Sequence, residues 1–535
     1  VTAAPLARAQ NSATLTDGTQ PPVVLTVASL NKLMQDTNYI TGVAGQPQFG
    51  GMFAMMVGGF AAGIDMDRPI GMVLPLVNGV PQPIVLVPTS DIKSILKRYE
   101  AQTGPVDELD DGTLVISVNQ NTVYIKQRGN TAIAAQDASV IDLIPADPAG
   151  LFAGMGNAYD IAVRVKIQEV PAEIRGMLMD QMRQGFDQAM AAQPNGDQTR
   201  AMAENSIAQL EQLIQDSDEM KFGINIDQSS KNIAMDFSFT AVGGSKMAAM
   251  YGSQQSIPSQ FASVIRDDAA AYFHGASSVG QEMIDQSKDS VENAITMVQG
   301  ALANEGALTD DQLAKIDLYV SRVADIFMDS ISEGKSDAGG LLLANKDKLQ
   351  FVFGMFVADG GKVADLAKDL AKEVPDVDGA PRFKFDIGTY EGVTMHVIEA
   401  DVPASADEAR QVFGEKLQIY IGTAPKAVYM CLGRDSSDLL KQFIKSGGGD
   451  TATDRPLAQF KLKLLPIMEF AQSVEANDGI AAMINALSSS QDKGDITVIS
   501  DSIPNGSDMK MTIGEGLIKA IAAAAIAGQQ AGAAF

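Results

Sequence analysis

The chain of 535 residues contains 40 basic and 66 acidic residues, which gives a formal net charge of −26. This charge repels nucleic-acid phosphates and anionic lipid head groups, so we expect neither as a partner. Hydrophobic residues make up 46% of the chain, which excludes disorder as the main state, and the length predicts two large modules because one core stops growing at ~250 to 300 residues.

Residues 1–27 are polar and end in the extended run PPVVLTV, which predicts an N-terminal arm or an edge strand. We expect Val23, Val24 and Leu25 to contact neighbouring subunits by strand addition to a sheet edge. The first ten residues, VTAAPLARAQ, resemble the end of a secretory signal. The sequence therefore predicts an exported protein of the periplasm, the cell surface or the extracellular space.

A first module is expected over residues 28–256. It begins with a helix and contains a methionine-rich segment, Gly50 to Met66, that favours one of two structures. The segment forms an apolar groove or a contact surface for a ligand or another chain, or it is an ordinary buried helix packed closely through glycine. The candidate contact residues are Met52, Phe53, Met55, Met56 and Phe60.

Short apolar runs bounded by Gly, Pro, Asn and Asp predict antiparallel strands in the rest of this module, and Ser90 and Asp91 can cap a helix that follows one of them. The densest acidic cluster contains Asp107, Asp110 and Asp111, which are weak candidates for a calcium site. Their spacing is not that of the EF-hand loop, so a solvated acidic turn is favoured.

The alternation from Tyr159 to Ile167 predicts a strand with one packed face, followed by helices over 172–192 and 199–216 and a hairpin. Residues 257–267 interrupt the pattern with Pro258 and small polar residues, which predicts a linker. A second module over 268–527 then repeats the plan, and residues 528–535 form a C-terminal tail in which Phe535 is a candidate assembly contact.

The two halves also match in sequence. The stretch from Val123 corresponds to the stretch from Ile419, with Tyr124 opposite Tyr420 (420 − 124 = 296), and a block ending at Asp91 corresponds to one ending at Asp359 (359 − 91 = 268). This period is far longer than that of solenoid repeats and indicates domain duplication. We therefore predict an α+β fold of two homologous tandem modules, each with a curved, mainly antiparallel sheet covered by helices.

Residues for common active sites are scarce. His274 and His396 are the two histidines, both in apolar runs, and the single cysteine, Cys431, lies in the run AVYMCL, where a buried inert thiol is the usual case. Neither a P-loop nor a strand-linked G-x-G-x-x-G is present. The sequence predicts no enzyme, no catalytic residues and no cofactor, apart from the weak calcium candidate. The longest uncharged stretches fall short of the ~20 residues of a transmembrane helix, so none is expected.

The tandem layout, the blocks ending at Asp91 and Asp359 and the closing hairpin followed by a Gly-rich helix at 514–530 resemble large uncharacterised secreted proteins of planctomycete-type bacteria. The resemblance implies an envelope or extracellular location and no active-site residues. Our first hypothesis is a non-enzymatic structural protein that self-assembles into a fibre, tube or surface layer, with itself as partner. The alternative is a periplasmic or extracellular binding protein or carrier for an apolar ligand.

Overall fold

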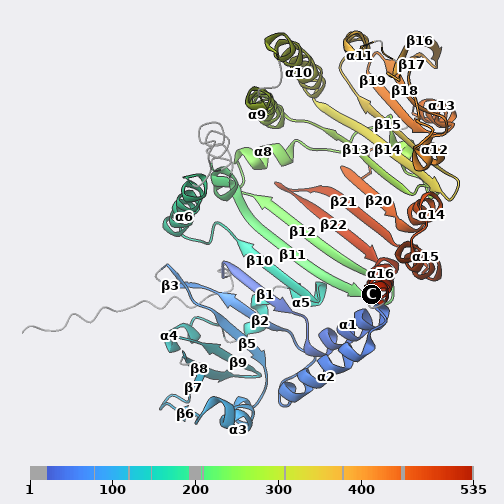
Figure 1. Cartoon of the computed structure of the whole chain (residues 1–535). Helices are drawn as coiled ribbons and strands as arrows, with labels where there is room; N and C mark the ends of the chain where they lie inside the picture. The colour runs from blue at the N-terminus through green and yellow to red at the C-terminus, as the bar shows by residue number, and fades with distance from the viewer. Residues whose placement is uncertain are drawn as a thin grey trace, which may run out of the picture. The chain divides into compact units, whose positions relative to one another are not determined.

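The structure is a computed structural model and describes residues 21–532 except 78, 119–120, 146, 153, 192–206, 208–209, 306–308, 376, 378 and 448–451. Its contacts divide the chain into two compact units. Unit 1 contains Val1–Gln181, Ser217–Ser230 and Met235–Ser238, and unit 2 contains Met182–Asp216, Lys231–Ala234 and Phe239–Phe535. Both units combine helices with antiparallel strands (Figure 1), so the predicted α+β class is confirmed.

Unit 1 is built on one main antiparallel sheet. Its strand order is β6-β7-β8-β9-β5-β2-β1-β10-β11. The elements in chain order are β1 (Val23–Val27), α1 (Leu30–Val43), α2 (Pro47–Ala61), β2 (Ile70–Leu74), β3 (Leu76–Val77), β4 (Val80–Pro81), β5 (Ile84–Pro88), α3 (Ile92–Thr103), β6 (Asp107–Glu108), β7 (Leu114–Val118), β8 (Asn121–Arg128), β9 (Thr131–Ala135), α4 (Ala138–Ile141), the 3₁₀ helix η1 (Pro148–Phe152), α5 (Met155–Ala158), β10 (Ile161–Lys166), α6 (Ala172–Ala191) and β11 (Ser217–Asp227).

Unit 2 contains a sheet with the strand order β16-β17-β18-β19-β15-β14-β13-β20-β21-β22. The elements that follow β11 are β12 (Asn232–Ala241), α8 (Lys246–Gly252), the 3₁₀ helix η2 (Ala262–Val264), β13 (Ala271–Ser278), α9 (Gln281–Glu305), α10 (Asp310–Ile331), β14 (Lys335–Asn345), β15 (Lys348–Phe356), α11 (Gly360–Glu373), β16 (Arg382–Tyr390), β17 (Val393–Asp401), α12 (Asp407–Phe413), β18 (Lys416–Ala424), β19 (Ala427–Gly433), α13 (Ser436–Ser446), β20 (Ala458–Lys463), α14 (Leu464–Val474), α15 (Asp478–Ser489), β21 (Asp495–Ile503), β22 (Gly506–Gly514) and α16 (Glu515–Gly532).

The strand orders of the two units agree strand for strand from β6 to β11 and from β16 to β21. The register agrees as well, because Tyr124 pairs with Ala135 between β8 and β9, and Tyr420 pairs with Cys431 between β18 and β19. Asp91 accepts a hydrogen bond from the Ser94 backbone at the start of α3, as predicted for a cap, and Asp359 caps α11 in the corresponding place.

Each unit has its own buried core. In unit 1, β-strand residues such as Val24, Val73 and Ile133 are fully buried against α4, η1 and α5, and α3 forms a second cluster on β7, β8 and β9. In unit 2, Leu440 of α13 and Phe261 beside η2 pack on Val352 of β15 and Cys431 of β19, and these side chains are at most 2% exposed. The burial alternates along the strands, so a helix-covered sheet face is defined in each unit.

Two predictions on the organisation of the chain are corrected. β1 is not an edge strand, because it pairs with β2 along one edge and with β10 along the other, so its backbone has no edge free for another chain. Residues 257–267 are not a linker, because they belong to unit 2 and place the fully buried Phe261 and Val264 in its core. The short polar residues that suggested a linker there form turns that enter the core.

The two ends of the chain are described in part. Residues 1–20 of the predicted arm, Phe535 and most of the helix predicted over 199–216 lie outside the described residues. At the C-terminal end, α16 continues to Gly532, beyond the predicted end of the second module at residue 527. The predicted tail is therefore helical over its first residues.

Candidate functional site: the apolar sheet faces

The main sheet of unit 2 has a second face, opposite the buried core. Along β15, Gln350, Val352, Gly354 and Phe356 are buried, and the residues between them are only partly buried. Because successive side chains of a strand point to opposite faces, the intervening residues lie on the other side of the sheet from α13 and η2. The sequence of β15, KLQFVFGMF, places aromatic side chains and methionine on this second face.

Cross-strand pairing extends this face over eight strands. A central row takes one residue from each strand from β22 to β18, namely Met511, Val498, Phe460, Phe273, Gly340, Phe353, Met430 and Ile421. The row on one side contains Ile513, Ile496, Leu462, Ala271, Leu342, Phe351, Leu432 and Ile419. The row on the other side contains Met509, Ser500, Ala458, Gly275, Ala338, Met355, Val428 and Thr423. We call these three rows the open face of unit 2.

The open face is apolar and accessible. Within the eight described strands no side chain of the three rows is charged, and Phe273 and Phe460 are each 38% exposed, although the pairing places them side by side. With about 4.8 Å between strands and about 3.4 Å per residue, the rows cover roughly 34 Å by 14 Å. At the β18 end Thr423 is buried and α11 packs on β18 and β19, so the accessible part lies over β13, β20 and β22, where Phe273, Phe460 and Met509 are exposed. An apolar patch of up to about 450 Å² is of the size that marks ligand or interaction sites on soluble proteins.

Aromatic packing organises the middle of this face. The rings of Phe273 and Phe353 lie 5.8 Å apart between centroids. Phe273 also lies over Gly340, because a Cβ added at this glycine would come within 2.1 Å of the ring. Gly340 therefore lets the ring lie flat against β14. The neighbouring row of Gly275, Ala338 and Ala458 adds small side chains beside the aromatic row.

Unit 1 has a corresponding apolar face. Its central row, from β5 to β11, contains Val85, Met72, Leu25, Val163 and Phe222. Val85 is 38% exposed and Phe222 is 40% exposed. Val23 belongs to the next row with Leu74 and Val165. Of the predicted assembly contacts, Val23 and Leu25 therefore lie on this face, and Val24 lies in the core.

The methionine-rich segment forms α2, a helix with one packed side and one exposed side. Gly50 is buried against α1, where an added Cβ would meet the side chains of Asn38 and Thr41. The opposite side exposes Met52 by 62%, Met55 by 79% and Phe60 by 61%. α2 is therefore a helix that packs closely through Gly50 on one side and exposes apolar side chains on the other. A contact of this side with a ligand or another chain stays a prediction. Phe53 is partly buried, and Met56 is 54% exposed.

The acidic cluster binds protein groups. Asp111 accepts hydrogen bonds from the backbone and hydroxyl of Thr113 and lies 2.9 Å from the Lys126 ammonium, which lowers the pKa of Asp111 to about 2. Asp107 lies in β6, and Asp110 is exposed in the turn that follows. In the described part of the chain no group of three His, Cys, Asp or Glu residues is placed to hold a metal ion. Calcium binding at this turn stays a prediction.

His274, His396 and Cys431 are buried, as predicted from their apolar surroundings. Ser259 lies between His274 and Asp337. Its Oγ donates to an Asp337 oxygen at 2.6 Å and lies 3.0 Å from His274 Nε2. In a catalytic triad the histidine lies between the serine and the acid, so this buried order does not activate the serine.

A second buried polar cluster lies in unit 1. The Lys32 ammonium is 2.6 Å from Asp36 and 3.3 Å from Asp160, and Asp160 also accepts a hydrogen bond from the Ile226 backbone. Burial raises the pKa of Asp160. Gln228 donates to Asp36. These bonds connect α1 with β10 and the end of β11, so the cluster has a structural role in this unit.

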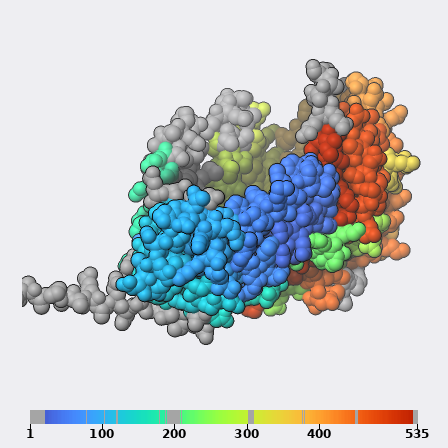
Figure 2. Space-filling model, turned by 90° about the horizontal axis from the view of Figure 1, so that it is seen from below, coloured from blue at the N-terminus to red at the C-terminus, as the bar shows by residue number. Residues whose placement is uncertain are grey.

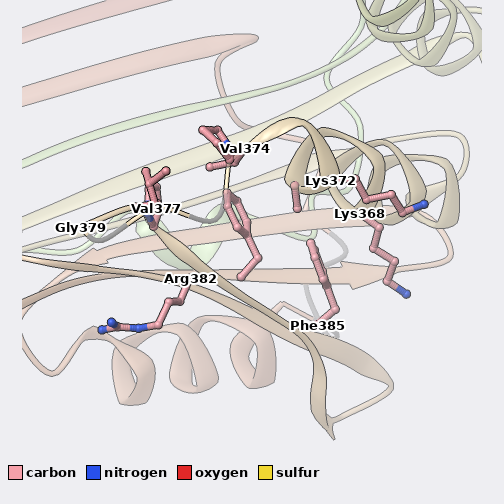
Figure 3. A pocket seen from close by; sticks show the side chains of 12 residues that line it. Lys368, Lys372, Val374, Val377, Gly379, Arg382 and Phe385 are labelled. Carbon is pink, nitrogen blue, oxygen red and sulfur yellow. The ribbon is translucent and has the colours of Figure 1, made fainter.

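A surface cavity of about 830 Å³ lies between α11 and the start of β16, both in unit 2. Lys368, Lys372 and Arg382 line it, but Figure 3 shows their charged ends pointing in different directions. Each is paired with a carboxylate at 2.8 Å: Lys368 with Asp386, Lys372 with Asp369, and Arg382 with Asp401. The three cations therefore do not converge on one anion position.

No protein-family model, no curated protein and no solved structure matches this chain. Among the described helices none is long and apolar enough to cross a membrane. The open apolar faces and the exposed side of α2 are the surface features that point to a function.

Proposed function

We propose that the protein is a binding protein or carrier for an apolar, chain-like ligand such as a lipid acyl chain, which lies on the open faces of its sheets. The observation that supports this most directly is the three-row apolar face of unit 2, with Phe273 and Phe460 each 38% exposed. The roughly 34 Å length of the central row exceeds the length of one acyl chain, which is about half of the ~30 Å hydrocarbon core of a bilayer. An extended chain therefore fits along the row.

A second copy of the protein fits this face less well. Two such faces together would bury on the order of 900 Å² from the dimensions above, and stable protein interfaces bury about 1,200 to 2,000 Å². The net charge of −26 adds repulsion between copies. A small neutral ligand covers the apolar side chains without bringing these charges together.

We infer that the two halves arose by duplication of one ancestral domain. The shared strand order, the matching Tyr124 and Tyr420 pairings and the Asp91 and Asp359 caps support this inference. An apolar second face on the sheets of both halves is also expected if the ancestral domain already bound an apolar ligand. Binding rather than catalysis, in an exported protein, is part of this proposal.

Self-assembly through sheet edges remains the second candidate. β16 pairs only with β17 among the described strands, so its other edge is available. However, a bulge between Lys384 and Gly388 interrupts the edge, and Arg382, Lys384 and Asp386 place charges on it. Bulges and charges are the features with which edge strands prevent pairing. We therefore place ligand binding first.

The experiment is a titration of the full chain, freed of lipid, with a pyrene-labelled fatty acid, together with native mass spectrometry of the chain as purified. We expect saturable binding, which the pair Phe273→Ser and Phe460→Ser weakens at least tenfold. The matched control is Leu318→Ser in α10, where the side chain is 56% exposed outside the open face.

Saturable binding that is unchanged in the double variant would place the ligand elsewhere and contradict the proposal, as would the absence of binding. Light scattering on the same samples separates the two candidates. A lipid-free chain that forms large, regular assemblies supports the structural hypothesis instead.

A further inference from the structure

The exposed side of α2 is the most apolar helix surface among the described residues. Phe49, Met52, Met55, Met56 and Phe60 are exposed by 48%, 62%, 79%, 54% and 61%. The sequence contains no charged residue from Thr37 to Ile64, although charged residues make up 20% of the chain. In Figure 2 the blue segment that includes α1 and α2 faces the viewer at the surface of the molecule.

We propose that α2 docks this protein onto the surface of an uncharged lipid bilayer, with its methionine and phenylalanine side chains inserted among the acyl chains. At 1.5 Å per residue the helix is roughly 22 Å long, which is too short to cross the ~30 Å hydrocarbon core. It can lie in the interface, where apolar area sets the strength of binding. The inference depends on α2 alone and holds whether or not the sheet faces bind a ligand.

The distribution of charge favours an uncharged bilayer over an anionic membrane or a protein partner on α2. An anionic membrane is repelled by the net charge of −26, and α2 has no lysine or arginine to attract it. α1 after Asp36 and α2 contain no charged residue that could pair with the charged rim of a protein partner, and Arg98 of α3, beside the end of α2, donates to the Ala62 carbonyl. A neutral hydrocarbon layer bounded by zwitterionic head groups requires no opposite charge on the protein.

Area argues against a second copy in this position. An exposed stripe roughly 22 Å long and about 10 Å wide on each of two helices gives on the order of 450 Å², well below the 1,200 Å² of stable interfaces. A bilayer can surround the exposed side chains of a helix that projects into it. The contact of Gly50 with α1 fixes the orientation of α2, so the methionine side faces outward before the membrane is met.

The sequence offers a clean optical probe, because the chain contains no tryptophan. The full chain with Met55→Trp is mixed with phosphatidylcholine vesicles, and the tryptophan emission and the fraction that floats with the vesicles are measured. We expect a blue shift and co-flotation. The matched probe Leu318→Trp, on the 56% exposed position of α10, is expected to float with the vesicles without a shift.

A pair of charge variants provides the second arm. We expect Met55→Asp with Phe60→Asp to reduce vesicle binding at least tenfold, and Leu318→Asp with Val323→Asp, on similarly exposed positions, to leave it unchanged. Met55→Leu with Phe60→Leu should retain binding, which separates lost apolar contact from misfolding.

Three results overturn the proposal: no flotation of the parent chain, equal loss in both Asp pairs, or binding only to anionic vesicles. A parent chain that dimerises without vesicles, and an α2 Asp pair that is monomeric, would show that a second copy occupies α2.

Discussion

Replacing Phe460 and Phe261 by alanine, one at a time, tests whether the sheet of unit 2 has an open face. Phe460 is 38% exposed, so about three fifths of its surface is removed from water. Full burial of such a side chain is worth about 1.5 to 3 kcal/mol, and water can enter the space left on an open face, so we expect a loss of about 1 to 2 kcal/mol.

Phe261→Ala is the same substitution at a fully buried position and serves as the comparison for Phe460→Ala. Phe261 is 0% exposed and lies 5.7 Å from the Tyr429 ring and 6.0 Å from the Phe443 ring, between centroids. Truncation there leaves a cavity that packed neighbours cannot fill, and buried Phe→Ala changes cost about 3 to 5 kcal/mol. The two substitutions should therefore differ by about 1 to 4 kcal/mol, with the larger loss at Phe261.

Denaturant unfolding of the full chain measures this difference. Because a protein of two compact units need not unfold in one step, the transition assigned to unit 2 by hydrogen exchange in β13 and β20 is the one to compare. Equal losses for Phe460→Ala and Phe261→Ala would mean that the open face is covered in solution, and the reasoning from alternation and exposure would be wrong.

Three further predictions concern single residues. Burial raises the pKa of Cys431 to about 11. A thiol reagent at pH 8 should therefore label the folded chain far more slowly than the unfolded chain. Rapid labelling of the folded chain would contradict the buried position. Lys126 and Thr113 lower the pKa of Asp111 from 3.8 to about 2. The interaction therefore stabilises the fold fully above about pH 4, and this stabilisation is lost as the pH falls through 2. An NMR titration of the Asp111 carboxyl group checks the pKa, and the pH dependence should be absent in Asp111→Asn. Gly433 has a φ of 118° and lies beside the β15 backbone, whereas Gly129 has a φ of 57° and faces open space. Replacement by alanine should therefore lower the free energy of unfolding by about 1 kcal/mol at Gly129 and by clearly more at Gly433. The midpoints of denaturant unfolding measure this difference.

Much of the fold of unit 2 could be predicted from local patterns. The strands around Tyr420 and Cys431 follow from local patterns, because the apolar runs there end at turn residues. The match of Tyr124 with Tyr420 indicates the equivalent register in unit 1. Another matched block was wrong by one residue. The runs FKLKLL from Phe460 and AVRVKI from Ala162 are similar in sequence, which sets Phe460 opposite Ala162, but Phe460 lies on the open face and Ala162 in the core. A shift of one residue moves a side chain to the other face of a sheet.

The open face itself was not predicted, although β15 contains a signal for it. FVFGMF is apolar at every position, which is typical of a strand with apolar surroundings on both faces. The sequence does not show whether a helix covers the second face, because that depends on where chain segments far apart in the sequence pack. The same reason explains the failed prediction for Val24, since the partners of β1 come from residues 70–74 and 161–165.

The acidic surface and the apolar faces have to be considered together. An exposed apolar face favours association of the protein with itself, although the contact area estimated above is below that of stable interfaces. A charge of −26 opposes this, but the repulsion is screened beyond about 10 Å at 0.1 M salt. Like charge therefore slows the approach of two copies while leaving an uncharged ligand or bilayer unaffected. This difference favours neutral, lipid-like partners for both the open faces and α2.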